Sequence, residues 1–166
     1  MPIDPLTGFL RSCARLELDE PAQASCREAA ASVSDWSTLP ARAEDHGLAP
    51  ILRQHSRRCG VEFPREVSAA LSVLALRHRD AGRVQTATLI EIVDALDAAG
   101  IEHVALKGAV LAHDIYPAPE LRPLRDLDIL VAPGSGSHAQ AVLRDLSFDV
   151  PDEPPRRHRH HHLPGA

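Results

Sequence analysis

The spacing of apolar residues changes character near residue 100 of this 166-residue chain. Before that point they recur at helical intervals, as over 5–18 and 84–99, which predicts amphipathic helices. Beyond it come two short apolar runs bounded by turn residues, 101–106 and 126–131, which predict buried strands. We therefore expect a mixed α/β (α+β) fold, with a helical N-terminal region followed by a small sheet and flanking helices.

The same patterns predict the order of the elements and the domain organisation. Further helices are expected over 21–33, on either side of a break at Gly47, from Pro64 to His78, over 109–115 and after a cap at Ser137. These patterns predict a helical region over 1–83, an α/β core over 84–150 and a Pro/Arg/His-rich tail over 151–166. We expect the tail to be flexible.

Composition excludes several classes of protein. The net charge is −5 and aromatic residues make up 3%, which argues against general nucleic-acid binding and against a base-stacking platform. No apolar run reaches the length of a membrane span, and no signal peptide is visible, so we expect a cytoplasmic protein. Cys13, Cys26 and Cys59 lack metal-site spacing and are expected to be reduced, buried thiols.

Two aspartates stand at the start of the second apolar run. Side chains alternate along a strand, so Asp126 and Asp128 are expected to share one face. Two adjacent carboxylates repel each other unless a cation lies between them. Paired oxygen ligands suit Mg²⁺, which fills its remaining positions with water and substrate phosphates.

The first apolar run ends at Lys107-Gly108, immediately before an expected helix. Backbone N–H groups at a helix start favour phosphate, and Gly108 lets an anion approach the backbone. Lys107 is the single lysine of the chain, beside seventeen arginines. It would supply a mobile cation near the same phosphate, and Arg122 and Arg125 could neutralise more negative charge.

These pieces occur together in the stretch VALKGAVLAHDIYPAPELRPLRDLDILV, residues 104–131. It resembles the signature of the uncharacterised nucleotidyltransferases of the DNA polymerase beta superfamily. That signature has an L-K-G turn, a helix ending in Y-P and an R-P-x-x-D-x-D-x-L-V strand. The segment AEDHGLAPIL, with Trp36 before it, resembles the family's helical N-terminal region. The resemblance extends from about Trp36 to Phe148.

The resemblance implies a nucleotidyltransferase fold, of which 84–150 would be an incomplete core. It also implies transfer of a nucleotidyl group from a nucleoside triphosphate to an acceptor hydroxyl, with Mg²⁺ or Mn²⁺ as cofactor. Carried over by position, Asp126 and Asp128 would be the catalytic metal ligands, and Gly108 the turn beneath the triphosphate. Lys107 stands where the wider superfamily usually has a glycine. The acceptor stays open among protein, RNA and small molecules.

The superfamily also uses a third carboxylate on a later strand. The acids that follow the last expected helix are Asp149, Asp152 and Glu153, in or beside a proline-rich segment. We do not expect them to replace it. The chain would then be the front part of a longer family member, or a protein that has lost catalysis. The alternative function is a non-catalytic module, derived from this fold, that binds nucleotide or protein.

The histidines need separate interpretation. A cluster at His158 and 160–162 could bind zinc or nickel, but neighbouring histidines in an extended tail do not prearrange a tetrahedral site. A solvated tail is therefore the favoured interpretation over a metal carrier. For His46 in the D-H-G step, helix capping or packing is favoured over catalysis. No G-x-S-x-G elbow or P-loop motif is present in the sequence.

Overall fold

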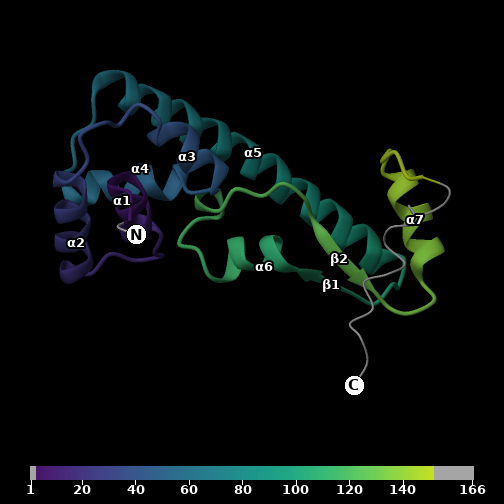
Figure 1. Cartoon of the computed structure of the whole chain (residues 1–166). Coiled ribbons are helices and arrows are strands. Elements are labelled where there is room, and N and C mark those ends of the chain that lie inside the picture. Colours follow the sequence, from purple (N-terminus) through teal and green to yellow (C-terminus); the bar gives the residue numbers. More distant parts are fainter. Residues whose placement is uncertain (1–2, 152–166) are drawn as a thin grey trace. The chain divides into compact units, whose positions relative to one another are not determined.

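The computed structural model describes residues 3–151, in which helices predominate (Figure 1). The helices are α1 (Pro5–Cys13), α2 (Glu20–Ala31), α3 (Leu39–Asp45), α4 (Ala49–Cys59), α5 (Arg65–Ala98), α6 (Lys107–Asp114) and α7 (Gly136–Asp145), with a 3₁₀ turn η1 (Pro119–Leu121). The strands β1 (His103–Leu106) and β2 (Asp128–Val131) pair in a small antiparallel sheet. The expected mixed α+β class with a helical N-terminal region is confirmed.

The chain divides into two compact units, which are described separately. Of the described residues, the first contains 3–90 and Ala105–Ile129, and the second contains Glu91–Val104 and 130–151. The segment limits expected from the sequence stay a prediction. Of the tail, residues 152–166 lie outside the described part of the chain, and so do Asp152, Glu153 and the clustered histidines.

Side-chain caps define where the first helices begin. The carboxylate of Asp4 accepts a hydrogen bond from Thr7 N at 3.0 Å, and that of Asp19 accepts one from Ala22 N at 2.9 Å. Each satisfies a backbone N–H that has no partner inside its helix. Gly47 follows α3 with a φ of 64°, a left-handed conformation that glycine adopts readily. The predicted break between two short helices is therefore confirmed.

The core of the first unit is formed mainly by helices α1 to α5. Its fully buried side chains include Phe9, Leu39, Leu52 and Leu71. Phe9 meets Trp36 edge-on, with ring centroids 5.0 Å apart. All three cysteines are free and buried, as expected, and Cys13 Sγ lies 3.4 Å from Cys26 Sγ. Burial raises the pKa of Cys59 to about 11, so its thiol stays protonated and packs as an apolar group.

Helix α5 is one continuous helix of 34 residues, where the sequence predicted two. Gly82 stands near the expected break, but an isolated glycine costs only about 1 kcal/mol in a helix interior. A Cβ at Gly82 would lie 3.5 Å from Glu120 Cα, so the glycine lets η1 pack closely on this part of the helix. Packing with η1 compensates for the weak helix propensity at this position.

The second unit is small. Its buried side chains are Ile92, Leu96, Ile101 and Ala139. His103 Nδ1 lies 2.9 Å from the carbonyl of Ile101, which satisfies this half-buried histidine within its own strand region. Among residues 3–151, no helix combines the length and apolar character needed to span a membrane.

Candidate functional site

The turn predicted to hold phosphate joins β1 directly to α6. Strand β1 ends at Leu106 and α6 begins at Lys107, without an intervening loop. Lys107 has a φ of 51°, which is unusual for a residue with a side chain. The position therefore has a backbone conformation that glycine adopts more readily than lysine. A strained, exposed lysine at the start of a helix is typical of a functional position.

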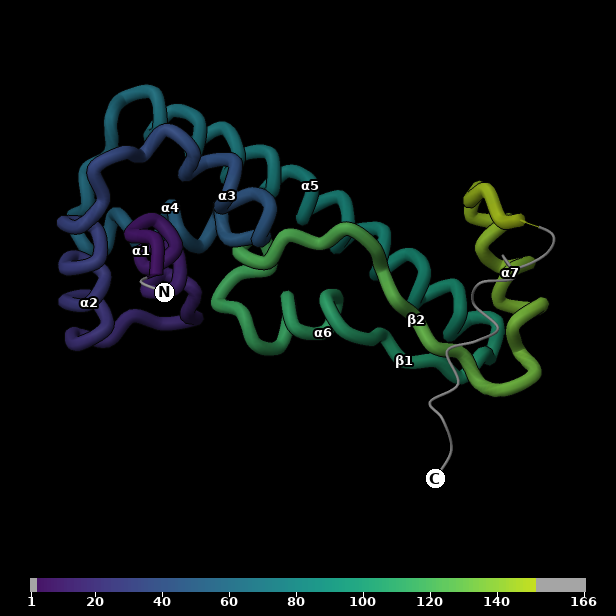
Figure 2. The backbone as a smooth tube through the Cα atoms, in the orientation of Figure 1, coloured from purple at the N-terminus to yellow at the C-terminus, as the bar shows by residue number. Residues whose placement is uncertain are grey.

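A second segment, residues 122–128, closes over this turn. Figure 2 shows the chain leaving α6, passing the end of α3 and entering β2. Gln85 Nε2 donates a hydrogen bond to the carbonyl of Leu124 at 2.9 Å, which ties the segment to α5. A Cβ at Gly108 would lie only 2.8 Å from Leu124 Cδ2. Gly108 thus lets the end of the Leu124 side chain pack closely on the turn, in addition to the backbone access that we predicted.

All the predicted site residues line one cavity of about 520 Å³ in the first unit. They are Lys107, Gly108, Arg122, Arg125, Asp126 and Asp128. The strand that carries the aspartates is shorter than predicted. It begins at Asp128, so Asp126 lies in the loop just before it. The two carboxyl groups nevertheless reach the same cavity from adjoining loop and strand positions.

Opposite charges meet inside this cavity. Lys107 Nζ lies 3.2 Å from Asp128 Oδ2, and the two side chains are 74% and 35% exposed. An ion pair this exposed stabilises the fold by little, about 0–1 kcal/mol. Its significance is that a cation already rests against the carboxylate predicted to bind a metal.

Arg122 is held differently from Lys107. Its guanidinium carbon lies 5.6 Å from the centroid of the Tyr116 ring, within range of a cation–π interaction. Its Nε atom is buried and has no hydrogen-bond partner within residues 3–151. Arg122 is therefore fixed against the cavity wall, whereas Lys107 is exposed and free to move.

The residues present fit a magnesium ion better than a metal that needs a full protein cage. Within residues 3–151, no group of three or more His, Cys, Asp or Glu side chains could hold a metal ion. Asp126 and Asp128 supply two hard oxygen ligands beside open space. Mg²⁺ is commonly bound by one or two carboxylates while waters and substrate phosphates complete its octahedron.

The structure adds one wall that the sequence did not predict. Asp45, His46 and Gly47 line the same cavity, between α3 and α4. The His46 backbone does cap α3, as expected, because its N–H bonds to the carbonyl of Arg42. Its side chain is exposed and lines the cavity, so it is not packed in the core. Two polar residues followed by a glycine at a helix break were the available signal.

The fold and the cavity together define a class of protein: an α+β chain whose site combines paired carboxylates with cations suited to phosphate. The model of the uncharacterised nucleotidyltransferase family matches residues 32–165, which is most of the chain, and the chain belongs to that family. No curated protein and no solved structure matches it.

Proposed function

We propose that this protein binds a nucleoside triphosphate with Mg²⁺ and transfers its nucleotidyl group to an acceptor hydroxyl. The observation that carries the proposal is the cavity in which Asp126 and Asp128 meet Lys107 and two arginines. A triphosphate needs positive charge around its oxygens, from cationic side chains and from a divalent metal ion. The cavity offers side chains for both purposes.

Each residue would have a distinct task. Asp126 and Asp128 would hold the metal through carboxylate oxygens, and Lys107, Arg122 and Arg125 would neutralise phosphate charge. When bound, Mg²⁺ supplies positive charge that offsets the charge developing on the phosphates. Lys107 would exchange its contact with Asp128 for one with the triphosphate, since its stem is flexible.

The reaction would be an in-line displacement at the α-phosphorus. The acceptor oxygen forms a new P–O bond while the bond between the α-phosphorus and the bridging oxygen breaks. The acceptor proton passes to a base or to water, and pyrophosphate leaves with the bonding electrons. The cationic side chains would stabilise the departing pyrophosphate because its negative charge grows as the bond breaks.

Metal and nucleotide binding can be tested without knowing the acceptor. Calorimetry should show that wild-type protein binds Mn²⁺ and MgATP, and that the double variant Asp126→Asn/Asp128→Asn has lost Mn²⁺ binding. The variant Asp114→Asn is a matched control, since this exposed acid lies at the end of α6 and outside the cavity lining. Equal Mn²⁺ affinity in the wild type and the double variant would overturn the metal assignment.

Transfer itself is tested with labelled nucleotide. Adding the wild type to a cell lysate should increase labelling of an acceptor from α-labelled ATP, and adding Asp126→Asn/Asp128→Asn should not. The wild type should cause no increase from γ-labelled ATP, because the γ-phosphate leaves with pyrophosphate. Retained MgATP binding without any α-label transfer would favour the alternative of a non-catalytic nucleotide-binding module.

A further inference from the structure

The turn Asp45–His46–Gly47, here called the α3–α4 turn, forms part of the cavity wall. It lies in the same unit as the predicted phosphate and metal residues. The side chains of Asp45 and His46 are exposed, so neither is used by the core. About 75 residues of chain separate this turn from the segment 122–128 that lines the same cavity.

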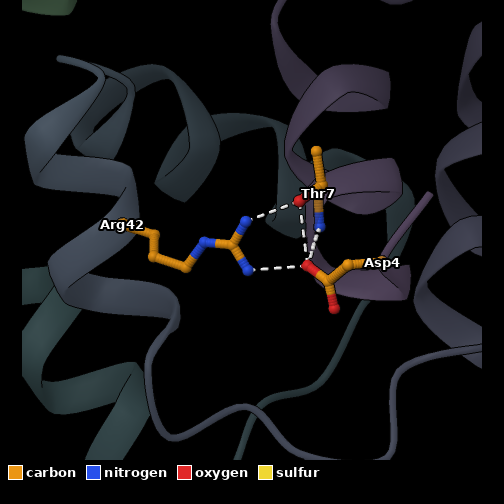
Figure 3. Close-up of polar contacts among 3 residues, drawn as sticks. All are labelled: Asp4, Thr7 and Arg42. Atoms are coloured by element: carbon orange, nitrogen blue, oxygen red, sulfur yellow. Dashed lines mark hydrogen bonds and ion pairs between the residues drawn. The ribbon is translucent and has the colours of Figure 1, made fainter. Parts of the chain in front are cut away.

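The helix before the turn is anchored on both sides. Arg42 Nη1 donates to Asp4 Oδ2 at 2.7 Å, and its other terminal nitrogen donates to Thr7, which ties α3 to α1 (Figure 3). Glu44 contacts Arg77 of α5 and also His78, whose Nε2 lies 2.7 Å from Glu44 Oε2. The turn that follows is therefore presented at the cavity by a helix with restricted freedom, as binding requires.

The backbone of the turn is also well defined. Gly47 N bonds to the carbonyl of Glu44 at 2.9 Å, and Leu48 N bonds to that of Ala43 at 2.7 Å. These bonds satisfy carbonyls at the end of α3, and the positive φ of Gly47 lets the chain turn. His46 and Asp45 are thus held on a closed helix end instead of a free loop.

The chemistry of this wall differs from that of the rest of the cavity. Lys107, Arg122 and Arg125 suit phosphate oxygens, whereas the turn contributes a carboxylate and an imidazole. A carboxylate repels a triphosphate but accepts hydrogen bonds from hydroxyl groups. An imidazole ring can stack on a nucleobase or bond to its edge. The wall therefore suits the uncharged part of a nucleotide.

We infer that the α3–α4 turn is the nucleoside subsite of the cavity. Asp45 accepts hydrogen bonds from the ribose hydroxyls, and His46 contacts the base. This inference rests on the proposed function and deepens it, because it makes a whole nucleotide, and not only its phosphates, the ligand that is recognised.

Magnesium tripolyphosphate separates the two parts of the site, because it has the phosphates of ATP without the nucleoside. Calorimetry should show that the wild type binds MgATP about tenfold more tightly than magnesium tripolyphosphate, a difference typical of one base contact. The variants His46→Ala and Asp45→Asn should lower the MgATP affinity towards that of tripolyphosphate. Their affinity for tripolyphosphate should not fall below that of the wild type, and it should rise in Asp45→Asn, because that substitution removes a carboxylate that repels phosphate.

Matched controls come from elsewhere in the chain. His138 and Asp114 are exposed and do not line the cavity, so His138→Ala and Asp114→Asn should bind both ligands as the wild type does. The fluorescence of Trp36, the one tryptophan in the sequence, reports whether each variant is folded. Both substituted side chains of the turn are exposed, so no loss of fold is expected.

Three results would overturn the inference. The first is an unchanged MgATP affinity in both turn variants, and the second is an equal loss for MgATP and tripolyphosphate, which would place the turn at the phosphates. In both cases the proposed function survives if Asp126→Asn/Asp128→Asn still removes metal binding. The third is a wild type that binds neither ligand, which refutes the proposed function and the subsite together.

Discussion

At the scale of the residue, Lys107 combines an unusual backbone with an unusual partner. A φ of 51° costs a residue with a side chain about 1–2 kcal/mol relative to the right-handed helix. The ion pair with Asp128 offsets little of this free-energy cost, since both side chains are substantially exposed. The stability of the fold therefore does not explain why residue 107 is a lysine. Its positive charge beside the Asp128 carboxylate does.

The substitution Lys107→Gly separates the effect of the left-handed backbone conformation from that of the positive charge. We expect a free energy of unfolding within about 1 kcal/mol of the wild type, because relief of the left-handed conformation offsets the greater chain entropy of glycine. Mn²⁺ affinity should rise about two- to fivefold, since the competing ammonium is gone. MgATP affinity should fall about tenfold through loss of a charged contact to phosphate.

Urea unfolding and calorimetry measure these effects. Lys107→Arg is the control that keeps the charge, so it should retain MgATP binding better than Lys107→Gly. A weaker Mn²⁺ affinity in Lys107→Gly would show that the lysine positions Asp128 for the metal instead of competing with it.

At the scale of the element, α3 is a helix of seven residues that depends on its neighbours. A helix this short is unstable alone in water. Arg42 holds it to α1 through Asp4 and Thr7 (Figure 3). Glu44 holds it to α5 through His78. Hydrogen bonds from Arg42 and Thr7 lower the pKa of Asp4 from 3.8 to about 2. The charged form of Asp4 is therefore favoured by folding.

The substitution Asp4→Asn tests whether the lowered pKa of Asp4 makes the stability of the fold depend on pH. A lowered pKa in the folded state contributes stability that is complete above about pH 4 and is lost as the pH falls through about 2. Asn keeps the N-cap of α1 but loses the charge opposite Arg42. We expect a slightly lower melting temperature for the variant above pH 4, and a difference that disappears near pH 2.

Melting curves between pH 2 and pH 7 measure that difference. Arg42→Gln should show the same pH dependence, and the double variant should show less than the sum of the two effects, because they remove one interaction. A difference between Asp4→Asn and the wild type that stays constant with pH would contradict the assignment.

At the scale of the whole molecule, the first unit contains both the main hydrophobic core and the cavity. Phe9 is fully buried and meets Trp36 and Phe63 edge-on, with centroids 5.0 and 6.0 Å away. Phe63 closes the cluster at 5.0 Å from Trp36. These three rings join α1 to the segments before α3 and α5, so they set the positions of the helices that present the α3–α4 turn.

Removal of the central ring should have a large effect on stability. We expect Phe9→Ala to lower the free energy of unfolding by about 3–5 kcal/mol, since it loses buried area and leaves a void. Trp36 fluorescence during urea unfolding measures this directly. Phe148→Ala is the control, because Phe148 is 38% exposed and belongs to the other unit, and it should change stability by less than about 1 kcal/mol. Equal effects of the two substitutions would contradict this account of the core.

Periodicity in the sequence predicted most helices and both strands of the described chain, because it reports which face each element buries. It missed the continuity of α5, since the packing of η1 at Gly82 is a contact between distant parts of the chain. It also placed Asp126 in β2, although pairing with β1 begins only at Asp128. Strand limits depend on the partner strand, which periodicity does not describe.

The sequence by itself determined the chemical types at the candidate site, because the spacing of Lys107, Gly108 and the two aspartates is local and repeats a known family signature. Only the tertiary structure decided that Asp45 and His46 face them, and that Lys107 rests on Asp128. Those contacts join segments far apart in the chain. They follow from helix packing in the core, to which many side chains contribute and which no single motif encodes.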